Sequence, residues 1–197
     1  MTYSKHALQR KRRGAVLELA TAVALIAFPA SALAGSGGIG PGGSGGTTTT
    51  SAPTGQTTPG PRAKLENGFA VPPAGAPPKV VRAIEAANRI VKGKPYCMGG
   101  GHSRWNDSCY DCSGSISYAL GKPGAGIVDA PMPSGSYMRW EDPGAGKWIT
   151  VYANEGHMYA VIAGLRLDTS NTVGDGPGWA TTGFRRPGFA VRHPRGL

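Results

Sequence analysis

The sequence predicts an α+β domain in which a short helix that carries a cysteine is followed by an antiparallel pair of strands that carries a histidine. Residues 112–120 form the predicted helix, because Asp111 is a good N-cap residue and Gly121 followed by Pro123 is a helix stop. Residues 157–163 are apolar on both faces, which is typical of a central strand. Residues 165–168 follow at once as a second strand.

The first 34 residues are predicted to be a secretory signal peptide. A leader with five Lys and Arg residues precedes an apolar stretch, and Ala32-Leu33-Ala34 offers the small-x-small pattern of a cleavage site. An uncleaved membrane anchor is the alternative. However, Glu18 interrupts an apolar run that is barely as long as the ~20 residues of a spanning helix. We therefore expect a secreted protein with no stable membrane insertion after cleavage.

Residues 35–78 are predicted to be a disordered linker rich in Gly, Pro and Thr. From Gly35 to about Pro61 there is hardly an apolar side chain, and such a composition buries too little surface to offset chain entropy. The pairs Pro72-Pro73 and Pro77-Pro78 extend the predicted linker. The remaining residues, 79–197, are enough for one small domain with one core.

The chain is basic, with a formal net charge of +10. Export would remove five of the 21 basic and one of the 11 acidic residues, which leaves 16 against 10, a net charge of +6. A moderately basic exported protein suits an anionic surface such as a cell wall, although solubility explains the charge equally well. Nucleic acid is not an expected partner, because the basic residues are scattered and no recognition helix or aromatic platform accompanies them.

Three cysteines, at positions 97, 109 and 112, leave one unpaired in an exported domain, and all three pairings are open. A zinc site would need a fourth ligand, for which His102 is the near candidate, but the spacing matches no recognised zinc pattern. A redox pair of Cys109 and Cys112 lacks the βαβ setting of such motifs. We expect neither a metal nor a cofactor.

Cys112 is the candidate nucleophile. It lies in the first turn of the predicted helix, on the face shared with Ile116, Ala119 and Leu120. Unpaired backbone N–H groups and the positive end of the helix dipole favour the thiolate, which is the form that attacks carbonyl groups. A buried cysteine or half of a disulfide is the alternative unless the chain supplies a base.

His157 is the candidate base, with a satisfied core histidine as the alternative. If the loop at 163–164 is even-numbered, Asp168 pairs across from Tyr159 and shares a face with His157, roughly 7–8 Å away on the diagonal. An odd-numbered loop would place Asp168 on the opposite face. Cys112, His157 and Asp168 would then be nucleophile, base and orienting carboxylate, and the backbone N–H of Cys112 would belong to the oxyanion hole.

These residues carry a family resemblance. Asp111-Cys112-Ser113-Gly114 opening a helix, Gly156-His157 opening a strand and a polar residue on the next strand resemble the NlpC-like peptidoglycan endopeptidases, which are small papain-like cysteine peptidases of bacterial cell walls. The stretch 94–100 is similar to the family's Pro-Tyr-x-x-Gly-Gly segment, and a predicted helix over 79–92 resembles the family's packing helix. The resemblance covers about residues 79–168, so 79–197 is interpreted as an NlpC-like cysteine peptidase domain.

The resemblance implies a papain-like fold in which N-terminal helices that carry the cysteine pack on a small antiparallel sheet that carries the histidine. It assigns catalysis to Cys112, His157 and Asp168. The residues that it places near the substrate are Tyr96, Asp111 and Ser113.

Beside the resemblance, the odd cysteine count and the position of Cys112 at the helix start predict a disulfide between Cys97 and Cys109, with Cys112 free. The chain departs from the family at three places. Asp168 stands where the family usually has His, residues 142–148 replace its Pro-Gly-Asp turn, and 121–147 is a long stretch poor in regular structure.

The leading interpretation is a secreted cysteine peptidase of the cell wall or extracellular medium that hydrolyses amide bonds in peptidoglycan stem peptides through a thioester intermediate. Transfer of the acyl group to an amine on the same triad is one alternative. A non-catalytic wall-binding module with a vestigial triad is another. Peptidoglycan peptides are the expected partner, and the protein is expected to be a monomer.

Overall fold

The protein is described by a computed structural model that covers residues 51–170, 174–183 and 187–197. These residues belong to one compact unit, which spans 47–197. The predicted signal peptide, 1–34, and the first part of the predicted linker lie outside the described residues.

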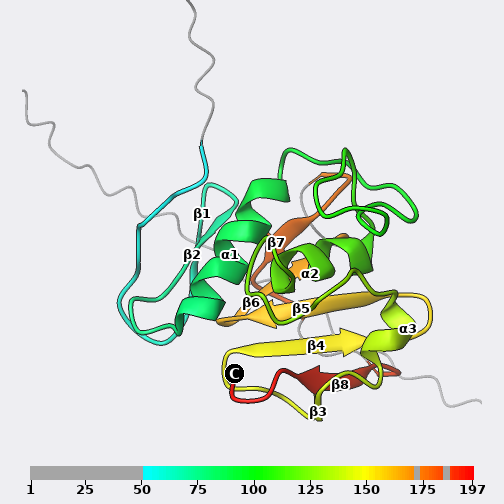
Figure 1. Ribbon diagram of the computed structural model, residues 1–197. Helices are drawn as coiled ribbons and strands as arrows, with labels where there is room; N and C mark the ends of the chain where they lie inside the picture. The colour runs from blue at the N-terminus through cyan, green and yellow to red at the C-terminus, as the bar shows by residue number, and fades with distance from the viewer. Residues whose placement is uncertain (1–50, 171–173, 184–186) are drawn as a thin grey trace, which may run out of the picture. The chain divides into compact units, whose positions relative to one another are not determined.

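The fold is α+β, with antiparallel sheets (Figure 1). Three helices are described, α1 (Pro78–Ile90), α2 (Cys112–Leu120) and α3 (Ser134–Tyr137). The larger sheet has six described strands in the order β3-β8-β4-β5-β6-β7. Their bounds are β3 Asp142–Pro143, β4 Ile149–Ala153, β5 Met158–Ile162, β6 Leu165–Asp168, β7 Gly178–Ala180 and β8 Ala190–His193.

The core lies between the two long helices and the sheet. Ile116 and Leu120 of α2 belong to the same buried cluster as Met158 and Ile162 of β5. Both α1 and α2 contact β5, so the central strand is covered on this face by helices (Figure 1). The bounds of α2 agree with the predicted helix 112–120, because Asp111 caps its N-terminus through the Gly114 N–H and Gly121 follows its last residue.

A two-residue turn fixes the register of β5 and β6. Ala163 and Gly164 both have positive φ, 47° and 85°, as the tight turns of hairpins require. The pairs are Ala160 with Leu167 and Ile162 with Leu165, and the same register continues to Tyr159 opposite Asp168. The loop is therefore even-numbered, and Asp168 lies on the same face of the sheet as His157, as contact between their side chains requires.

The second part of the predicted linker is folded, which corrects the expectation for these residues. A hairpin forms from β1 (Lys64–Glu66) and β2 (Phe69–Val71), and β2 contacts α1 (Figure 1). All three residues of β2 are buried. Together with Pro72 and Pro73, which follow and are buried as well, these apolar side chains pack this part of the chain on the domain.

The segment after β6 adds two strands at different places in the sheet. The sequence predicts an edge strand near residues 188–192, and β8 lies there, but it pairs with both β3 and β4 and is therefore not at the edge. β7 forms the edge next to β6. Within the described ranges, no helix has the length and apolar character needed to cross a membrane.

Candidate active site

Cys112 is the first residue of α2 and its side chain is 9% exposed. It is a free cysteine, because Cys97 and Cys109 are joined in a disulfide with their Cα atoms 5.6 Å apart. The pairing agrees with the sequence prediction, and it leaves neither Cys97 nor Cys109 available for a zinc site or for a redox pair with Cys112. As the first residue of α2, Cys112 has its sulfur at the positive end of the helix dipole.

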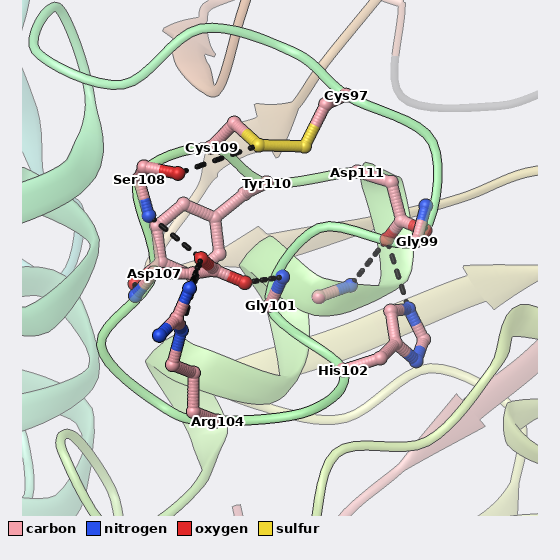
Figure 2. The surroundings of a disulfide bond; sticks show 11 residues. Cys97, Gly99, Gly101, His102, Arg104, Asp107, Ser108, Cys109, Tyr110 and Asp111 are labelled. Atoms are coloured by element: carbon pink, nitrogen blue, oxygen red, sulfur yellow. Dashed lines mark hydrogen bonds and ion pairs between the residues drawn. A yellow bond between two sulfur atoms is a disulfide. The ribbon is translucent and has the colours of Figure 1, made fainter.

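Asp111 fastens the loop between the disulfide cysteines to the start of α2 (Figure 2). One carboxylate oxygen, Oδ2, accepts the Gly99 N–H at 3.0 Å. The other, Oδ1, accepts the Gly114 N–H at 2.7 Å, the His102 Nε2 at 3.0 Å and the Ser113 hydroxyl at 3.2 Å. Four donors thus surround a buried carboxylate, so Asp111 holds the loop and the helix in one fixed arrangement.

His157 lies between Cys112 and Asp168. Its backbone N–H donates to Asn154 Oδ1 at 2.8 Å, which fixes the chain just before β5. Its Nε2 lies 2.9 Å from Asp168 Oδ1, and its side chain also hydrogen-bonds to Cys112. The hairpin register and the helix start therefore bring Cys112, His157 and Asp168 into one contiguous set.

The environment favours the charged form of His157. The hydrogen bond to Asp168 and then the one to Cys112 raise the pKa of the imidazole from 6.5 to about 9, against an opposing effect of desolvation. The side chain is 24% exposed, so the ring is largely but not fully removed from water. At neutral pH the ring carries a positive charge beside the cysteine sulfur.

Asp168 is fully buried and its two oxygens have different partners. Oδ1 faces His157 and also accepts the N–H groups of Thr169 at 2.7 Å and Ser170 at 3.1 Å. Oδ2 accepts a hydrogen bond from the guanidinium of Arg166, which is buried in the same strand. The carboxylate thus receives both charged and neutral donors.

An open cleft of about 300 Å³ leads to Cys112. Tyr96 lies at its rim, and burial together with negative charge at Cys112 and Asp111 raises the pKa of the Tyr96 phenol. Met98 stands on the rim with 85% of its surface exposed. The other lining residues are Gly99, His102, Asp111, Ser113, Pro133, Ser134, Glu155 and Gly156. The three residues expected near the substrate, Tyr96, Asp111 and Ser113, therefore all line the cleft.

Two residues of the site were not singled out by sequence reasoning. Arg166 was not considered, because a charged residue in a short strand is more often at the surface. His102 was considered as a zinc ligand, whereas it hydrogen-bonds to Asp111 at the start of α2. The run of three glycines before His102 was the available indication, since Gly100 and Gly101 pack against Cys109 and Tyr110 with no room for a Cβ.

Among residues 51–170, 174–183 and 187–197, no group of three or more His, Cys, Asp or Glu side chains is arranged to hold a metal ion. A larger cavity of about 530 Å³ lies apart from Cys112 and is lined by residues 92–95 and 174–177.

No family model and no curated protein matches the chain. Among solved structures, the chain is similar to the P60 domain from the M. avium subspecies paratuberculosis antigen MAP1204, with 22% identity and a TM-score of 0.41 over 58% of this chain and 93% of that one. It is also similar to a mutant of the Resuscitation Promoting Factor Interacting protein RipA, with 19% identity and a TM-score of 0.41 over 70% of this chain and 72% of that one. At these values the likeness carries no functional argument.

Proposed function

We propose that the chain is an exported cysteine peptidase that hydrolyses amide bonds in peptidoglycan stem peptides. One observation carries the chemical part of this proposal: the imidazole of His157 hydrogen-bonds to the free thiol of Cys112 and to the buried carboxylate of Asp168. A nucleophile, a base and an orienting carboxylate in this order are the set that amide hydrolysis through a thioester requires.

The proposed reaction starts from a thiolate and an imidazolium. With Nε2 of His157 held by Asp168, Nδ1 is the nitrogen that exchanges a proton with Cys112. The thiolate attacks the scissile carbonyl carbon, and the backbone N–H of Cys112 helps to hold the resulting oxyanion. The imidazolium gives its proton to the leaving amine as the C–N bond breaks, which leaves a thioester and a neutral imidazole.

Hydrolysis of the thioester completes the cycle. The neutral imidazole takes a proton from a water molecule, whose oxygen attacks the thioester carbonyl carbon. The C–S bond then breaks, the acid product leaves, and the thiolate–imidazolium pair is restored. Asp168 holds one orientation of the ring throughout.

Three features support the substrate class and the location. The resemblance of Asp111-Cys112-Ser113-Gly114 and Gly156-His157 to the NlpC-like endopeptidases implies a cell-wall peptide and a papain-like arrangement of helix and sheet. The predicted signal peptide and the basic charge fit an exported protein at an anionic wall. The cleft beside Cys112 is open, so that an extended peptide can enter it.

The test is digestion of purified sacculi, with the soluble products identified by mass spectrometry. We expect wild-type protein to release muropeptides, and Cys112→Ala and His157→Ala each to lower the rate at least about a thousandfold. His193→Ala is the matched control, because within the described residues the side chain of that half-buried histidine hydrogen-bonds to the Gly144 carbonyl alone, so the substitution should leave the rate unchanged. Unaltered release by Cys112→Ala would refute the proposal.

Product masses and thiol labelling separate the two alternatives. An acyl transferase would give products in which an amine, not water, has been added. A wall-binding module would release nothing, and its Cys112 would react with iodoacetamide at the slow rate of an ordinary thiol. Cys112 is the single free thiol among the three cysteines of the chain, so labelling reports on it alone.

A further inference from the structure

Arg166 is a buried cation that the proposed mechanism does not use. Its side chain is 1% exposed, although arginine is almost never fully buried unless it is paired. It lies on β6 two residues before Asp168, so both side chains project from the same face of the strand. Its burial therefore places a positive charge directly behind the proposed catalytic carboxylate.

Three contacts hold the guanidinium. Nη2 donates to Asp168 Oδ2, and Nη1 donates to the carbonyl of Gly183 at 2.6 Å. The guanidinium carbon lies 4.0 Å from the centre of the Tyr159 ring on β5. Arg166 thus joins β5, β6 and the segment after β7 on the face of the sheet that carries Asp168.

Gly183 is fitted to this role. Its φ is +79°, a backbone conformation that residues other than glycine rarely adopt, and an added Cβ would overlap Nη1 of Arg166. The carbonyl of residue 183 can approach the guanidinium only because no side chain stands between them.

The charges alternate from one neighbouring side chain to the next. Arg166 is positive, Asp168 negative, His157 positive and Cys112 negative in the thiolate form. Arg166 occupies Oδ2, which leaves Oδ1 to face Nε2 of His157. A carboxylate held at both oxygens cannot rotate away from the imidazole, whereas one held only by neighbouring N–H groups has less constraint.

We infer that Arg166, anchored by the Gly183 carbonyl, is a positioning residue that orients Asp168 toward His157 and sets the charge balance of the Cys112–His157–Asp168 set. This inference rests on the proposed function for its link to catalysis. Its structural content, the control of the His157–Asp168 pair, is measurable without any substrate.

The sign of the effect follows from the groups that surround the pair. His157 faces Cys112 from α2 and Asp168 from β6, while Arg166 faces Asp168, Tyr159 and the Gly183 carbonyl. Loss of the Arg166 charge removes a cation that competes with the imidazolium for Asp168. Proton loss from His157 would then leave a buried carboxylate without a cationic partner, so the pKa of His157 must rise.

Two variants separate charge from geometry. Arg166→Gln removes the charge, and the titration of the His157 ring followed by NMR is expected to move up by about one pH unit. Arg166→Lys keeps the charge but has one nitrogen where the guanidinium uses two, Nη1 and Nη2, so it cannot hold Asp168 and Gly183 together. For this variant the titration is expected to stay near that of wild type, while kcat on sacculus peptides falls about tenfold or more with KM little changed.

Arg192→Gln is the matched control. Arg192 lies on β8 of the same sheet and donates to the Met138 carbonyl at 2.8 Å, so its replacement also removes a guanidinium bound to a backbone carbonyl. It is expected to leave both the His157 titration and kcat as in wild type. Circular dichroism of all three variants separates loss of fold from loss of positioning.

An unchanged His157 titration in folded Arg166→Gln would overturn the inference. If that variant does not fold, Arg166→Lys decides. Its two readouts are kcat and the NMR resonance of the His157 ring N–H that bonds to Asp168. If both are identical to those of wild type, the inference is overturned. If wild-type protein hydrolyses nothing, the proposed function fails, but the titration and the ring N–H resonance still test whether Arg166 controls the His157–Asp168 pair.

Discussion

Protonation of the His157 side chain makes the stability of the protein depend on pH. Its pKa in the folded protein, about 9, lies above the ordinary value of 6.5, chiefly because Asp168 accepts its hydrogen bond. Binding of the proton is thus stronger in the folded than in the unfolded chain. The contribution of His157 to stability is therefore fully present below pH 6.5 and is lost as pH rises through about 9.

This difference predicts the pH dependence of one substitution. We expect the free energy of unfolding of wild type to exceed that of His157→Gln most at about pH 6 and to approach it steadily up to about pH 9.5. Urea unfolding of both proteins across this range measures the difference. The same pair in a Cys112→Ala background keeps the effect of Asp168 and removes that of the thiol. A difference that stays constant with pH would show that the imidazole is not held in its charged form.

Some of these residues could be predicted from the sequence and others could not, for a physical reason. Cys112 is marked by its N-cap and helix stop, which act locally, and Asp168 by its place on the strand after His157, although the sequence left open on which face it lies. Arg166 has no such local mark. Its burial depends on the Gly183 carbonyl, seventeen residues away and without any recognisable turn or period between them.

At the scale of elements, the start of α2 is packed too closely for any residue but glycine at position 114. A Cβ there would overlap the Gly100 carbonyl and lie 3.2 Å from Asp111 Oδ1. Alanine normally stabilises a helix by about 1 kcal/mol relative to glycine. Here the overlap is with backbone, which cannot move without displacing the loop that the disulfide closes.

We therefore expect Gly114→Ala to destabilise the protein, by roughly 1–3 kcal/mol, against the helix propensity. Denaturant unfolding gives the magnitude. Gly75→Ala is the control, because a Cβ at that position meets no atom within 4 Å, and it should change stability by less than about 0.5 kcal/mol. An increase in stability for Gly114→Ala would mean that α2 and the loop are not in contact as described.

The two hairpins show what the sequence can predict for elements. The pair β5 and β6 combines an apolar run with a turn that ends in Gly164, so both strands follow from local residues, whereas the sequence left the register open between an even- and an odd-numbered loop. The pair β1 and β2 has three residues in each strand and lies among prolines and glycines. Its stability comes from contact with α1, which no local pattern in the hairpin reveals.

At the scale of the whole molecule, Asn88 joins three segments that are distant in sequence. From α1, its side chain accepts the Ala70 N–H at 3.0 Å and donates to the Ala70 carbonyl at 2.8 Å. The same Oδ1 accepts the Trp179 indole N–H of β7 at 2.9 Å. Because Asn88 is buried, its amide N–H would lose the Ala70 carbonyl if the N-terminal hairpin were absent, while the Trp179 indole N–H would keep Asn88 Oδ1 as its acceptor.

The described fold therefore begins before position 79, the predicted domain boundary. We expect a chain that starts at Lys79 to be less stable than one that starts at Ser51, by roughly 3 kcal/mol or more, because it exposes the apolar surface that Phe69 and Val71 cover and leaves Asn88 without Ala70. Urea unfolding of the two chains measures this, and Asn88→Ala in the longer chain should reproduce part of the loss. Equal stability of the two chains would mean that residues 64–71 rest on the domain without contributing to it, and would restore the boundary that the sequence alone predicts.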